Sequence, residues 1–315
     1  MPEKQIKVLY RFFLPASDAS VLEQNVDRVD VEQNGVYERM RYRGWGNGKM
    51  KKKNRIVFIT GCGSGLGKDA ALALARRGHR VIATTRTAAS AKEINSLAAD
   101  QKLSIESFKL DVTVPEDREK IVDYDIDVLI NNVGIGESGS LAEIDVERIR
   151  NNFEVNVFGP LELTQLALKN MMKKDSGTVI FIGSLVGRIA LPFLAPYCMT
   201  KFSLSGGADA LRQELRKVTK NVHVSIVELG GYHTGFNQKN IARKYEWMGK
   251  DSYFNEIVED IRAQEERFFS RSELHSTKTA VDVIVKAVEA RNPKLRYVAP
   301  WWQGAFVQLE RIFGK

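Results

Sequence analysis

A tyrosine and a lysine four residues apart, Tyr197 and Lys201, are well spaced to move a proton. If the segment is helical, both side chains project from one face, one turn apart. A nearby ammonium favours the phenolate, and lowering the phenol pKa by about 3 requires about 4 kcal/mol of differential interaction. We therefore predict that Lys201 lowers the pKa of Tyr197 enough for proton exchange near neutral pH. Ser184 precedes the pair by 13 residues and ends a buried apolar run.

A glycine-rich turn predicts a second kind of chemistry, the binding of a nucleotide phosphate. It lies between an apolar run at 56–60 and a helical pattern, and its residues are Gly61, Cys62, Gly63, Ser64, Gly65, Leu66 and Gly67. Glycine lets a pyrophosphate approach the backbone closely, where a Cβ would intrude. The N-terminus of the following helix supplies N–H donors and a partial positive charge.

Arg86 indicates which dinucleotide is bound. It follows the second apolar run, 19 residues after Gly67, where an NAD-binding protein places a carboxylate on the ribose 2′-hydroxyl. A guanidinium can instead bind a 2′-phosphate through forked, charge-assisted hydrogen bonds, and Ser64 can add a hydroxyl. The sequence therefore favours NADP(H); NAD(H) stays possible if Arg86 is an ordinary surface residue.

Polar residues also end the third and fourth apolar runs. Asp111, followed by Val112, is expected to accept a hydrogen bond from the adenine amino group. The fourth run closes with Asn131, Asn132, Val133 and Gly134. Here we expect Asn131 to tie neighbouring strand ends together beneath the cofactor. In a parallel sheet these ends all lie at the ligand-binding edge.

A parallel sheet is needed to bring these residues together, and the sequence from Arg55 onward has the pattern of one. Short β-branched runs alternate with helical patterns, and most runs are continuously apolar, as in strands buried on both faces. Strands are predicted at 56–60, 80–85, 104–110, 127–131, 178–183, 222–227 and 296–299, and helices near 66–77, 89–99, 115–122, 145–172, 197–219 and 277–290. We predict an α/β fold, a single doubly wound (Rossmann) domain of about seven parallel strands with helices on both faces.

Five signals in this order resemble those of the short-chain dehydrogenase/reductase family, in particular its single-domain members that prefer NADP(H). They are TGxxxGxG from Thr60 to Gly67, NNVG from Asn131 to Gly134, Asn156, Ser184, and YxxxK at Tyr197 and Lys201. The resemblance spans about residues 55–299. It implies that Tyr197 is the general acid/base and that Ser184 orients the substrate oxygen. It also implies that Lys201 holds the nicotinamide ribose and that Asn156 positions a water in a proton relay.

The resemblance further implies a cofactor contact after the sixth strand, at Gly230 and Thr234. Members of the family usually carry Pro-Gly there, whereas this chain has Leu229 before the glycine. Because this proline is missing, two properties stay open: the rigidity of the loop, and which face of the nicotinamide ring is presented to the substrate.

Two segments flank this loop and the last strand. Residues 232–276 are long and rich in aromatic side chains, and their place in the chain is typical of a lid over the carboxyl ends of the strands. Residues 301–313 are amphipathic. We expect them to cover the pocket or form a subunit contact rather than to lie on a membrane surface.

Residues 1–50 do not share the alternating pattern, and we interpret them as an N-terminal appendage to a catalytic domain at 51–315. One hypothesis is that the natural start is Met50, so that a start at Met1 is too early. The alternative is a short β appendage that uses residues 36–42. The mass of the natively expressed protein distinguishes the two.

Composition excludes several classes of protein. The 315 residues are 43% hydrophobic and 27% charged, which excludes disorder, and no apolar stretch is long enough to span a membrane. Half of the net charge of +8 comes from residues 1–53, which hold 11 Lys/Arg against 7 Asp/Glu, so the body lacks the basic face of a nucleic-acid binder. Two cysteines and four scattered histidines predict no disulfide framework and no metal site. We expect a cytoplasmic homodimer or homotetramer with a small-molecule substrate.

The predicted function is that of an NADP(H)-dependent oxidoreductase, which transfers a hydride between the nicotinamide and a carbonyl or secondary alcohol. Apolar residues after Ser184 and in the lid favour an apolar, medium-sized substrate such as a steroid, retinoid, fatty or aromatic carbonyl. The enzymatic alternative is an NAD(P)-binding epimerase or dehydratase. The non-enzymatic alternative is an NADPH-sensing scaffold without catalysis.

Overall fold

A computed structural model of the chain describes residues 54–314, apart from the side chains of Lys239 and Ile241. The predicted appendage, with its alternatives of a start at Met50 or a strand at 36–42, lies outside the described residues. Within them, the predicted strands are present with shifts of at most two residues at their ends.

Seven parallel strands form one sheet in the order β3-β2-β1-β4-β5-β6-β7. Their bounds are β1 Ile56–Ile59, β2 Arg80–Thr85, β3 Ile105–Lys109, β4 Val128–Asn131, β5 Gly177–Ser184, β6 Val222–Leu229 and β7 Arg296–Ala299. The strand order reverses between β1 and β4, and the crevice at the carboxyl ends there is where such sheets bind ligands. The predicted doubly wound α/β sheet is confirmed.

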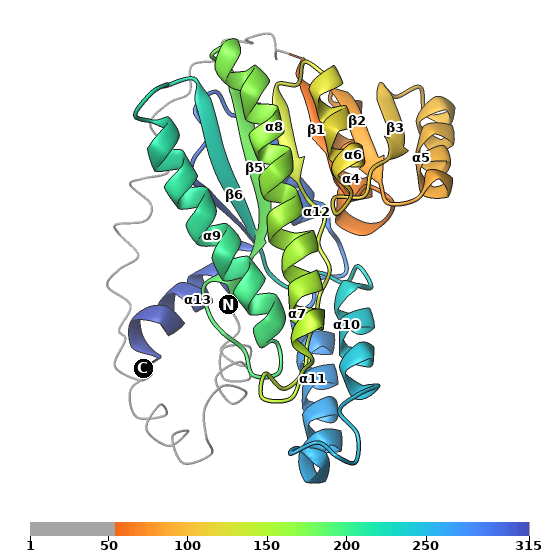
Figure 1. Ribbon diagram of the computed structural model, residues 1–315, viewed down its shortest axis with the longest axis vertical. Helices are drawn as coiled ribbons and strands as arrows, with labels where there is room; N and C mark the ends of the chain where they lie inside the picture. The colour runs from red at the N-terminus through yellow and green to blue at the C-terminus, as the bar shows by residue number, and fades with distance from the viewer. Residues whose placement is uncertain (1–53, 315) are drawn as a thin grey trace. The chain divides into compact units, whose positions relative to one another are not determined.

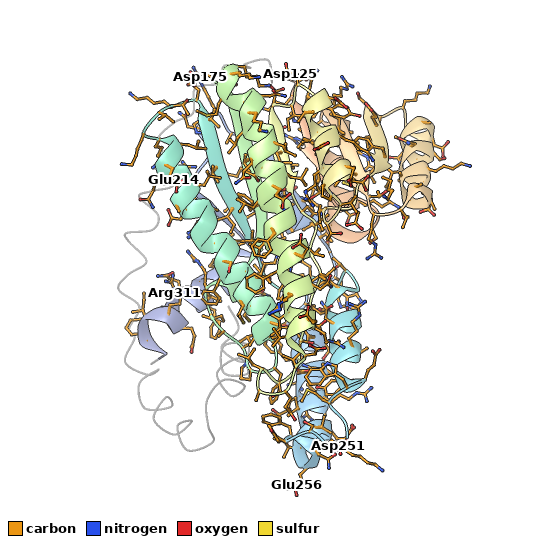
Figure 2. All side chains as sticks on the ribbon, in the orientation of Figure 1. Asp125, Asp175, Glu214, Asp251, Glu256 and Arg311 are labelled. Carbon is orange, nitrogen blue, oxygen red and sulfur yellow. The ribbon has the colours of Figure 1, made fainter. Side chains whose placement is uncertain are left out.

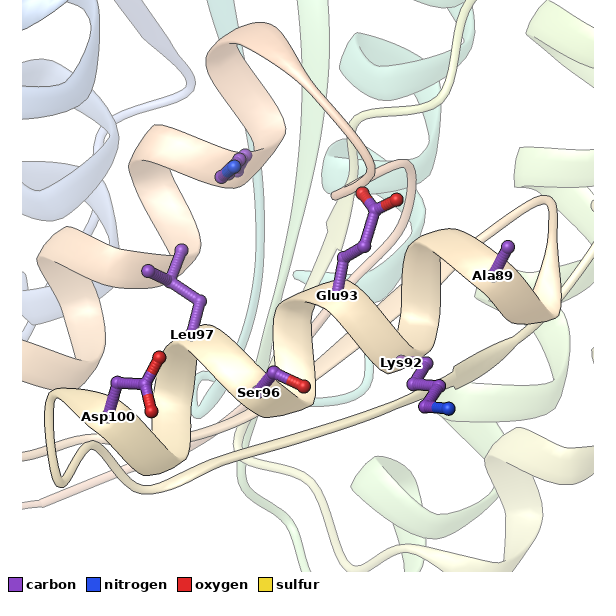
Figure 3. Close-up of a pocket in the computed structure, with 7 residues that line it drawn as sticks. Ala89, Lys92, Glu93, Ser96, Leu97 and Asp100 are labelled. Carbon is purple, nitrogen blue, oxygen red and sulfur yellow. The ribbon is translucent and has the colours of Figure 1, made fainter.

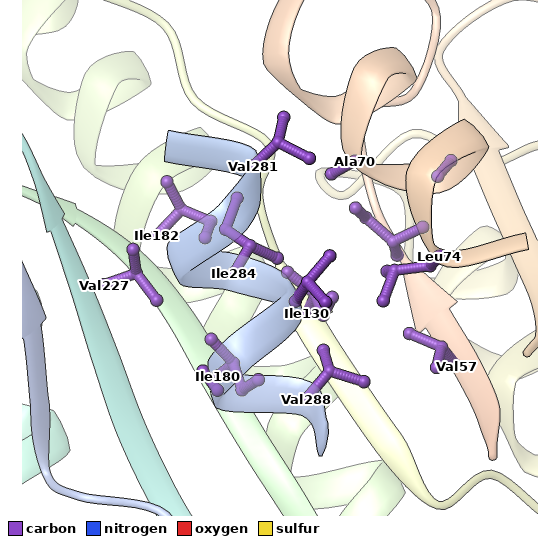
Figure 4. Close-up of a cluster of buried hydrophobic side chains, with 14 of the residues drawn as sticks. Val57, Ala70, Leu74, Ile130, Ile180, Ile182, Val227, Val281, Ile284 and Val288 are labelled. Carbon is purple, nitrogen blue, oxygen red and sulfur yellow. The ribbon is translucent and has the colours of Figure 1, made fainter. Parts of the chain in front are cut away.

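Helices cover both faces of the sheet (Figure 1). Because successive strand side chains point to opposite faces, Val57 and Ile59 join one apolar core and Phe58 joins the other. The first core is closed by α4 (Gly65–Arg76), α5 (Ala88–Asp100) and α12 (Lys278–Glu289); Figure 4 shows Val281, Ile284 and Val288 of α12 facing strand residues and Leu74 of α4. The second core is closed by α8 (Gly159–Lys173) and α9 (Ala195–Leu215).

The predicted helix at 145–172 is wrong in its middle. Helix α7 (Val146–Phe153) passes into a π-helical segment, η2 (Glu154–Phe158), before α8 begins. Pro160 has no N–H to donate back to η2, and a Cβ on Gly159 would lie 2.5 Å from the carbonyl oxygen of Val112. The chain therefore changes its winding where it must approach the loop after β3. The predicted helix at 115–122 likewise divides into α6 (Pro115–Glu119) and a 3₁₀ turn, η1 (Lys120–Asp123).

The predicted lid contains two helices beyond the carboxyl ends of the strands, α10 (Phe236–Tyr245) and α11 (Val258–Ser272), with a short turn, η4 (Asn255–Ile257), between them (Figure 1). Asp251 and Glu256 mark its outer tip (Figure 2). The two ends of the segment meet, because Tyr232 forms a β-bridge with Leu274. The lid is thus joined to the sheet domain through a narrow neck.

Helix α13 (Trp301–Phe313) follows β7 directly. It is amphipathic as predicted: Gly304 and Val307 are buried, whereas Trp301 and Phe313 are each 74% exposed. No helix within residues 54–314 is long and apolar enough to cross a membrane. Nor do those residues contain a cluster of three or more His, Cys, Asp or Glu side chains able to hold a metal ion.

Candidate active site

The glycine-rich turn joins β1 to α4 at the point where the strand order reverses. Gly61 and Gly65 have φ angles of +72° and +55°, in the left-handed region that favours glycine. A Cβ on Gly67 would lie 2.3 Å from the carbonyl oxygen of Gly61, so α4 can pack on the turn only if residue 67 is glycine. Ser64 precedes α4, and its side chain makes no capping hydrogen bond. The turn and the helix N-terminus together form a cradle that fits a pyrophosphate.

Two apolar residues of the turn point away from this cradle. Leu66 packs on the first core and Cys62 is fully buried, where its thiol donates to the carbonyl oxygen of Ile59 at 3.4 Å. Burial raises the pKa of the Cys62 thiol, which keeps it protonated and unreactive.

The turn that carries Arg86 lies beside the phosphate cradle. A Cβ on Gly63 would lie 3.5 Å from the Cβ of Ser90, near the start of α5, so the two turns are in contact. Arg86, directly after β2, and Ser64 are both exposed. Their predicted contact with a 2′-phosphate stays a prediction.

The turn after β3 is held by hydrogen bonds of its own. Asp111 Oδ1 accepts from the backbone N–H and the hydroxyl of Thr113, at 3.0 and 2.8 Å. Val112 is buried, and its carbonyl oxygen accepts from Arg118 Nη1 at 2.7 Å. These bonds fix both residues at the ligand edge of the sheet, and their adenine contacts stay predictions.

The asparagine that ties the strand ends together is Asn132, and our prediction of Asn131 is wrong. Asn132 Nδ2 donates to the carbonyl oxygens of Thr60 and Gly61, at 2.8 and 3.2 Å. The Thr60 hydroxyl accepts from the backbone N–H groups of Asn132 and Val133, at 3.0 and 3.1 Å. Asn131 instead donates to the hydroxyl of Thr164 in α8, at 2.9 Å, because strand alternation turns it to the helix-covered face.

Asn156 lies in the π-helical segment η2 and is completely buried. Its Oδ1 accepts from the N–H of Ile135 at 2.8 Å, and its Nδ2 donates to the carbonyl oxygen of Ile135 at 2.8 Å. The same Nδ2 lies within hydrogen-bonding distance of Asn152 Oδ1 and Thr200 Oγ1, at 3.2 and 3.1 Å. A Cβ on Gly134 would lie 3.5 Å from Asn156 Oδ1 and 3.7 Å from Lys201 Nζ, so Asn156 and Lys201 flank the same loop.

Ser184, Tyr197 and Lys201 come together at the carboxyl end of β5. Ser184 is the last residue of β5, and a 3₁₀ turn, η3 (Leu185–Gly187), leads from it toward α9, which begins two residues before Tyr197. The Ser184 hydroxyl donates to the carbonyl oxygen of Leu229 at 3.2 Å and accepts from the N–H of Val186 at 3.3 Å. Lys201 Nζ lies 5.5 Å from the centre of the Tyr197 ring and donates to the carbonyl oxygen of Ile182 at 3.0 Å.

The predicted lowering of the Tyr197 pKa is wrong in direction. Burial raises the pKa of the phenol above its usual range, and the hydrogen bond with Ser184 opposes this only in part. Burial also lowers the pKa of Lys201 to about 8. Loss of solvation disfavours the charged form of each group, and this outweighs the attraction that we predicted. The protein therefore holds a protonated phenol beside a lysine that loses its charge as the pH rises through about 8.

The lid places an aromatic wall over this cluster. The Phe236 ring of α10 lies 5.6 Å from the Tyr197 ring. Thr234 lies against the phosphate cradle, since its Cβ is 3.4 Å from the position that a Cβ on Gly65 would occupy. Phe193, after η3, makes an edge contact with Phe254 of the lid, 5.0 Å between centroids. The catalytic cluster and the cradle therefore lie at the same edge of the sheet, each in contact with a residue of the lid segment.

Two residues of this network were not predicted from the sequence, Asn152 and Thr200. Both are fully buried and hold Asn156. Thr200 lies inside the YxxxK motif, which marks Tyr197 and Lys201 but gives no reason to select it. Asn152 lies four residues before Asn156, a helical spacing that was the available signal.

A separate surface groove lies between α4 and α5 (Figure 3). It is lined by Lys68, Ala89, Lys92, Glu93, Ser96, Leu97 and Asp100. Its charges are of both signs, and it includes neither Ser184 nor Tyr197. We therefore assign it no part in the chemistry of the crevice.

A doubly wound sheet with a glycine cradle at its switch point and a Ser, Tyr and Lys cluster at the same edge defines an oxidoreductase of the Rossmann type. The sequence profile of the short chain dehydrogenase family matches residues 55–244. The chain belongs to this family, as the sequence resemblance predicted.

Two relatives of the chain are named as dehydrogenases. It is 31% identical over 254 residues to human 17-beta-hydroxysteroid dehydrogenase type 1, covering 77% of this chain and 76% of the relative. It is 29% identical over 256 residues to bovine retinol dehydrogenase 8, covering 77% and 80%. A short-chain dehydrogenase structure from Streptomyces avermitilis aligns with a TM-score of 0.66 at 25% identity, covering 81% of this chain and 92% of that one.

Proposed function

We propose that the chain is an NADP(H)-dependent oxidoreductase that interconverts a carbonyl and a secondary alcohol in an apolar, medium-sized substrate. One observation carries the proposal. The Ser184, Tyr197 and Lys201 cluster and the phosphate cradle form one site at the carboxyl edge of the sheet, where β5 and β1 end on either side of β4. Within it, a nicotinamide cofactor would supply or accept the hydride.

Tyr197 is the proton donor for carbonyl reduction. Its raised pKa keeps the phenol protonated at neutral pH, so it can donate to the oxygen that becomes the alcohol. The Ser184 hydroxyl holds the same oxygen, and its bonds to Leu229 and Val186 fix its position at the strand end. In the reverse direction the phenol must first lose its proton, so that the phenolate can accept the proton of the alcohol.

Lys201, beside the Tyr197 ring, and Asn156 support this step. The Lys201 ammonium can bind ribose hydroxyls and stabilise negative charge that develops on the phenol oxygen. Asn156 holds the backbone of Ile135 through two hydrogen bonds, which orients this loop to bind a water for the proton relay. The cofactor contacts expected at Gly230 and Thr234 belong to the same proposal, since Thr234 lies against Gly65.

The preference for NADP(H) rests on Arg86. It is exposed beside the cradle, where a 2′-phosphate would lie, and β2 ends there without a carboxylate. The substrate class rests on the aromatic wall of Phe236, Phe193 and Phe254. The names of the relatives, hydroxysteroid and retinol dehydrogenases, support an apolar substrate.

A homodimer or homotetramer is part of the proposal. Helices α8 and α9 expose apolar side chains on their outer faces, which include Leu161, Met199 and Phe202 at 41–43% exposure. Exposed apolar side chains of this kind are a common feature of subunit interfaces. The cytoplasmic location stays a prediction.

The test is oxidation of NADPH at 340 nm with a panel of steroid, retinoid, fatty and aromatic carbonyls. We expect turnover with an apolar ketone or aldehyde, and at least a 100-fold loss of turnover in Tyr197→Phe, with NADPH affinity retained. NADPH binding without turnover of any carbonyl would favour the sensing scaffold. Full activity of Tyr197→Phe would disprove the proton-transfer role.

A further inference from the structure

The loop after β6 is a wall of the proposed cofactor site. It begins beside the catalytic cluster, because the Ser184 hydroxyl donates to the carbonyl oxygen of Leu229 at 3.2 Å. It ends against the phosphate cradle, where Thr234 meets Gly65. The backbone between them, Gly230 and Gly231, therefore spans the crevice from the reacting centre to the phosphates.

This stretch has little stiffness of its own. Two successive glycines carry more backbone freedom than any other pair of residues, and the proline usual in the family is replaced by Leu229. The sheet holds only the first glycine, since Gly230 N–H donates to the carbonyl oxygen of Ala299 at 2.8 Å. Strand β7 ends at Ala299, so Gly231 is beyond the reach of the sheet.

A side chain from the C-terminal helix holds the second glycine. The Gly231 N–H donates to Gln303 Oε1 at 2.9 Å, and Gln303 Nε2 donates to the carbonyl oxygen of Ser272 at 2.9 Å. The Gly231 carbonyl in turn accepts from the N–H of Leu274 at 3.0 Å. One amide thus joins three segments, namely the loop after β6, the last turn of the lid helix α11 and the start of α13.

The amide of Gln303 also packs closely against the first glycine, Gly230. A Cβ on Gly230 would lie 1.7 Å from Gln303 Oε1, so the glutamine amide occupies the space that any other side chain would need. Gln303 is also partly buried at the base of α13, which limits the rotamers that its amide can adopt. Gln303 therefore depends on both glycines, on Gly230 for space and on Gly231 for the hydrogen bond.

We propose that Gln303 is a positioning residue for the cofactor: it fixes the Gly230–Gly231 backbone across the crevice and ties that backbone to the neck of the lid. The inference rests on the proposed function and names a residue that acts through the loop rather than on the reacting atoms. In this chain the brace supplies the rigidity that a proline would otherwise supply.

The experiment compares three full-length variants with the unmodified chain. Gln303→Leu removes both hydrogen bonds at similar volume. Gln303→Glu keeps an acceptor for Gly231 but loses the donor to Ser272. Gln308→Leu, at an exposed position of the same helix, is the matched control. The readouts are NADPH affinity by fluorescence titration, kcat and KM, and amide hydrogen exchange of the peptide that contains Gly231.

In Gln303→Leu we expect NADPH affinity to fall about 3- to 10-fold, the value of about one net hydrogen bond. Exchange at Gly231 should become faster, while Gln308→Leu changes neither. Gln303→Glu should recover most of the NADPH affinity, which a merely structural role in α13 would not produce. Unchanged affinity and unchanged exchange in Gln303→Leu would overturn the inference.

Failure of the proposed function is distinguishable from failure of this inference. If the proposed function is wrong, the unmodified chain will show no NADPH binding or no turnover. Hydrogen exchange at Gly231 needs no cofactor, so it reports on the brace in either case. Faster exchange in Gln303→Leu supports the brace, and equal exchange overturns it.

Discussion

Replacing Lys201 with methionine should stabilise the fold at neutral pH while it removes activity. Burial lowers the pKa of Lys201 from 10.5 to about 8. The charge that the proposed mechanism needs therefore lowers the free energy of unfolding. At 1.36 kcal/mol for each pKa unit, the difference corresponds to about 3 kcal/mol. Methionine has a similar length and no charge, so Lys201→Met removes this cost.

Two contacts are lost in the same variant and reduce the gain. They are the hydrogen bond from Lys201 Nζ to the carbonyl oxygen of Ile182, at 3.0 Å, and the contact of the ammonium with the Tyr197 ring. Together they are worth about 1–2 kcal/mol. We therefore expect Lys201→Met to be more stable than the unmodified chain by about 1–2 kcal/mol at pH 7.

The pH dependence gives the sharper test. Between pH 8 and 10.5 the unfolded chain keeps the Lys201 proton that the folded chain loses, so the free energy of unfolding of the unmodified chain rises with pH. Lys201→Met lacks this contribution. The difference in free energy of unfolding between the variant and the unmodified chain should therefore fall by about 2–3 kcal/mol from pH 7 to pH 10. Urea unfolding of both proteins at the two pH values measures the change, and other titrating groups cancel in the difference. A stability difference that is the same at both pH values would refute the reasoning.

Three further perturbations test the cofactor site and the crevice. Arg86→Asp should lower the ratio of kcat/KM for NADPH over NADH by about 10- to 100-fold, the value of a charge-assisted pair; unchanged selectivity would remove Arg86 from the 2′-phosphate site. Gly67→Ala should abolish NADPH binding, because the new Cβ would lie 2.3 Å from the carbonyl oxygen of Gly61. Its control is Gly207→Ala in α9, where a Cβ has no neighbour within 4 Å, and which should raise the free energy of unfolding by about 0.5–1 kcal/mol in a thermal or urea melt. Ser184→Ala should lower kcat about 100-fold with less change in NADPH affinity, measured by steady-state kinetics and titration, and a normal kcat would exclude Ser184 from holding the substrate oxygen.

Much of the fold was predictable because its signals are local. A strand buried on both faces must be continuously apolar, and a helix must repeat its apolar face every three to four residues, so the seven strands and the main helices could be located one by one. The cradle from Gly61 to Gly67 and the pair Tyr197 and Lys201 are also local patterns. Their chemistry depends on spacing within a single turn or helix, which the order of residues specifies directly.

The tertiary structure decided the properties that depend on which side chains come into contact. Asn131 and Asn132 are identical side chains one residue apart, and only their alternation across β4 makes the second one tie the strand ends. The pKa of Tyr197 depends on how completely neighbouring segments exclude water, which spacing to Lys201 does not reveal. Gln303 is separated from Gly231 by 72 residues, and α13 brings them together only because β7 lies beside β6 in the sheet. Order along the chain thus specifies the elements and the residue types available, whereas burial and long-range contacts assign each side chain its partner and its charge.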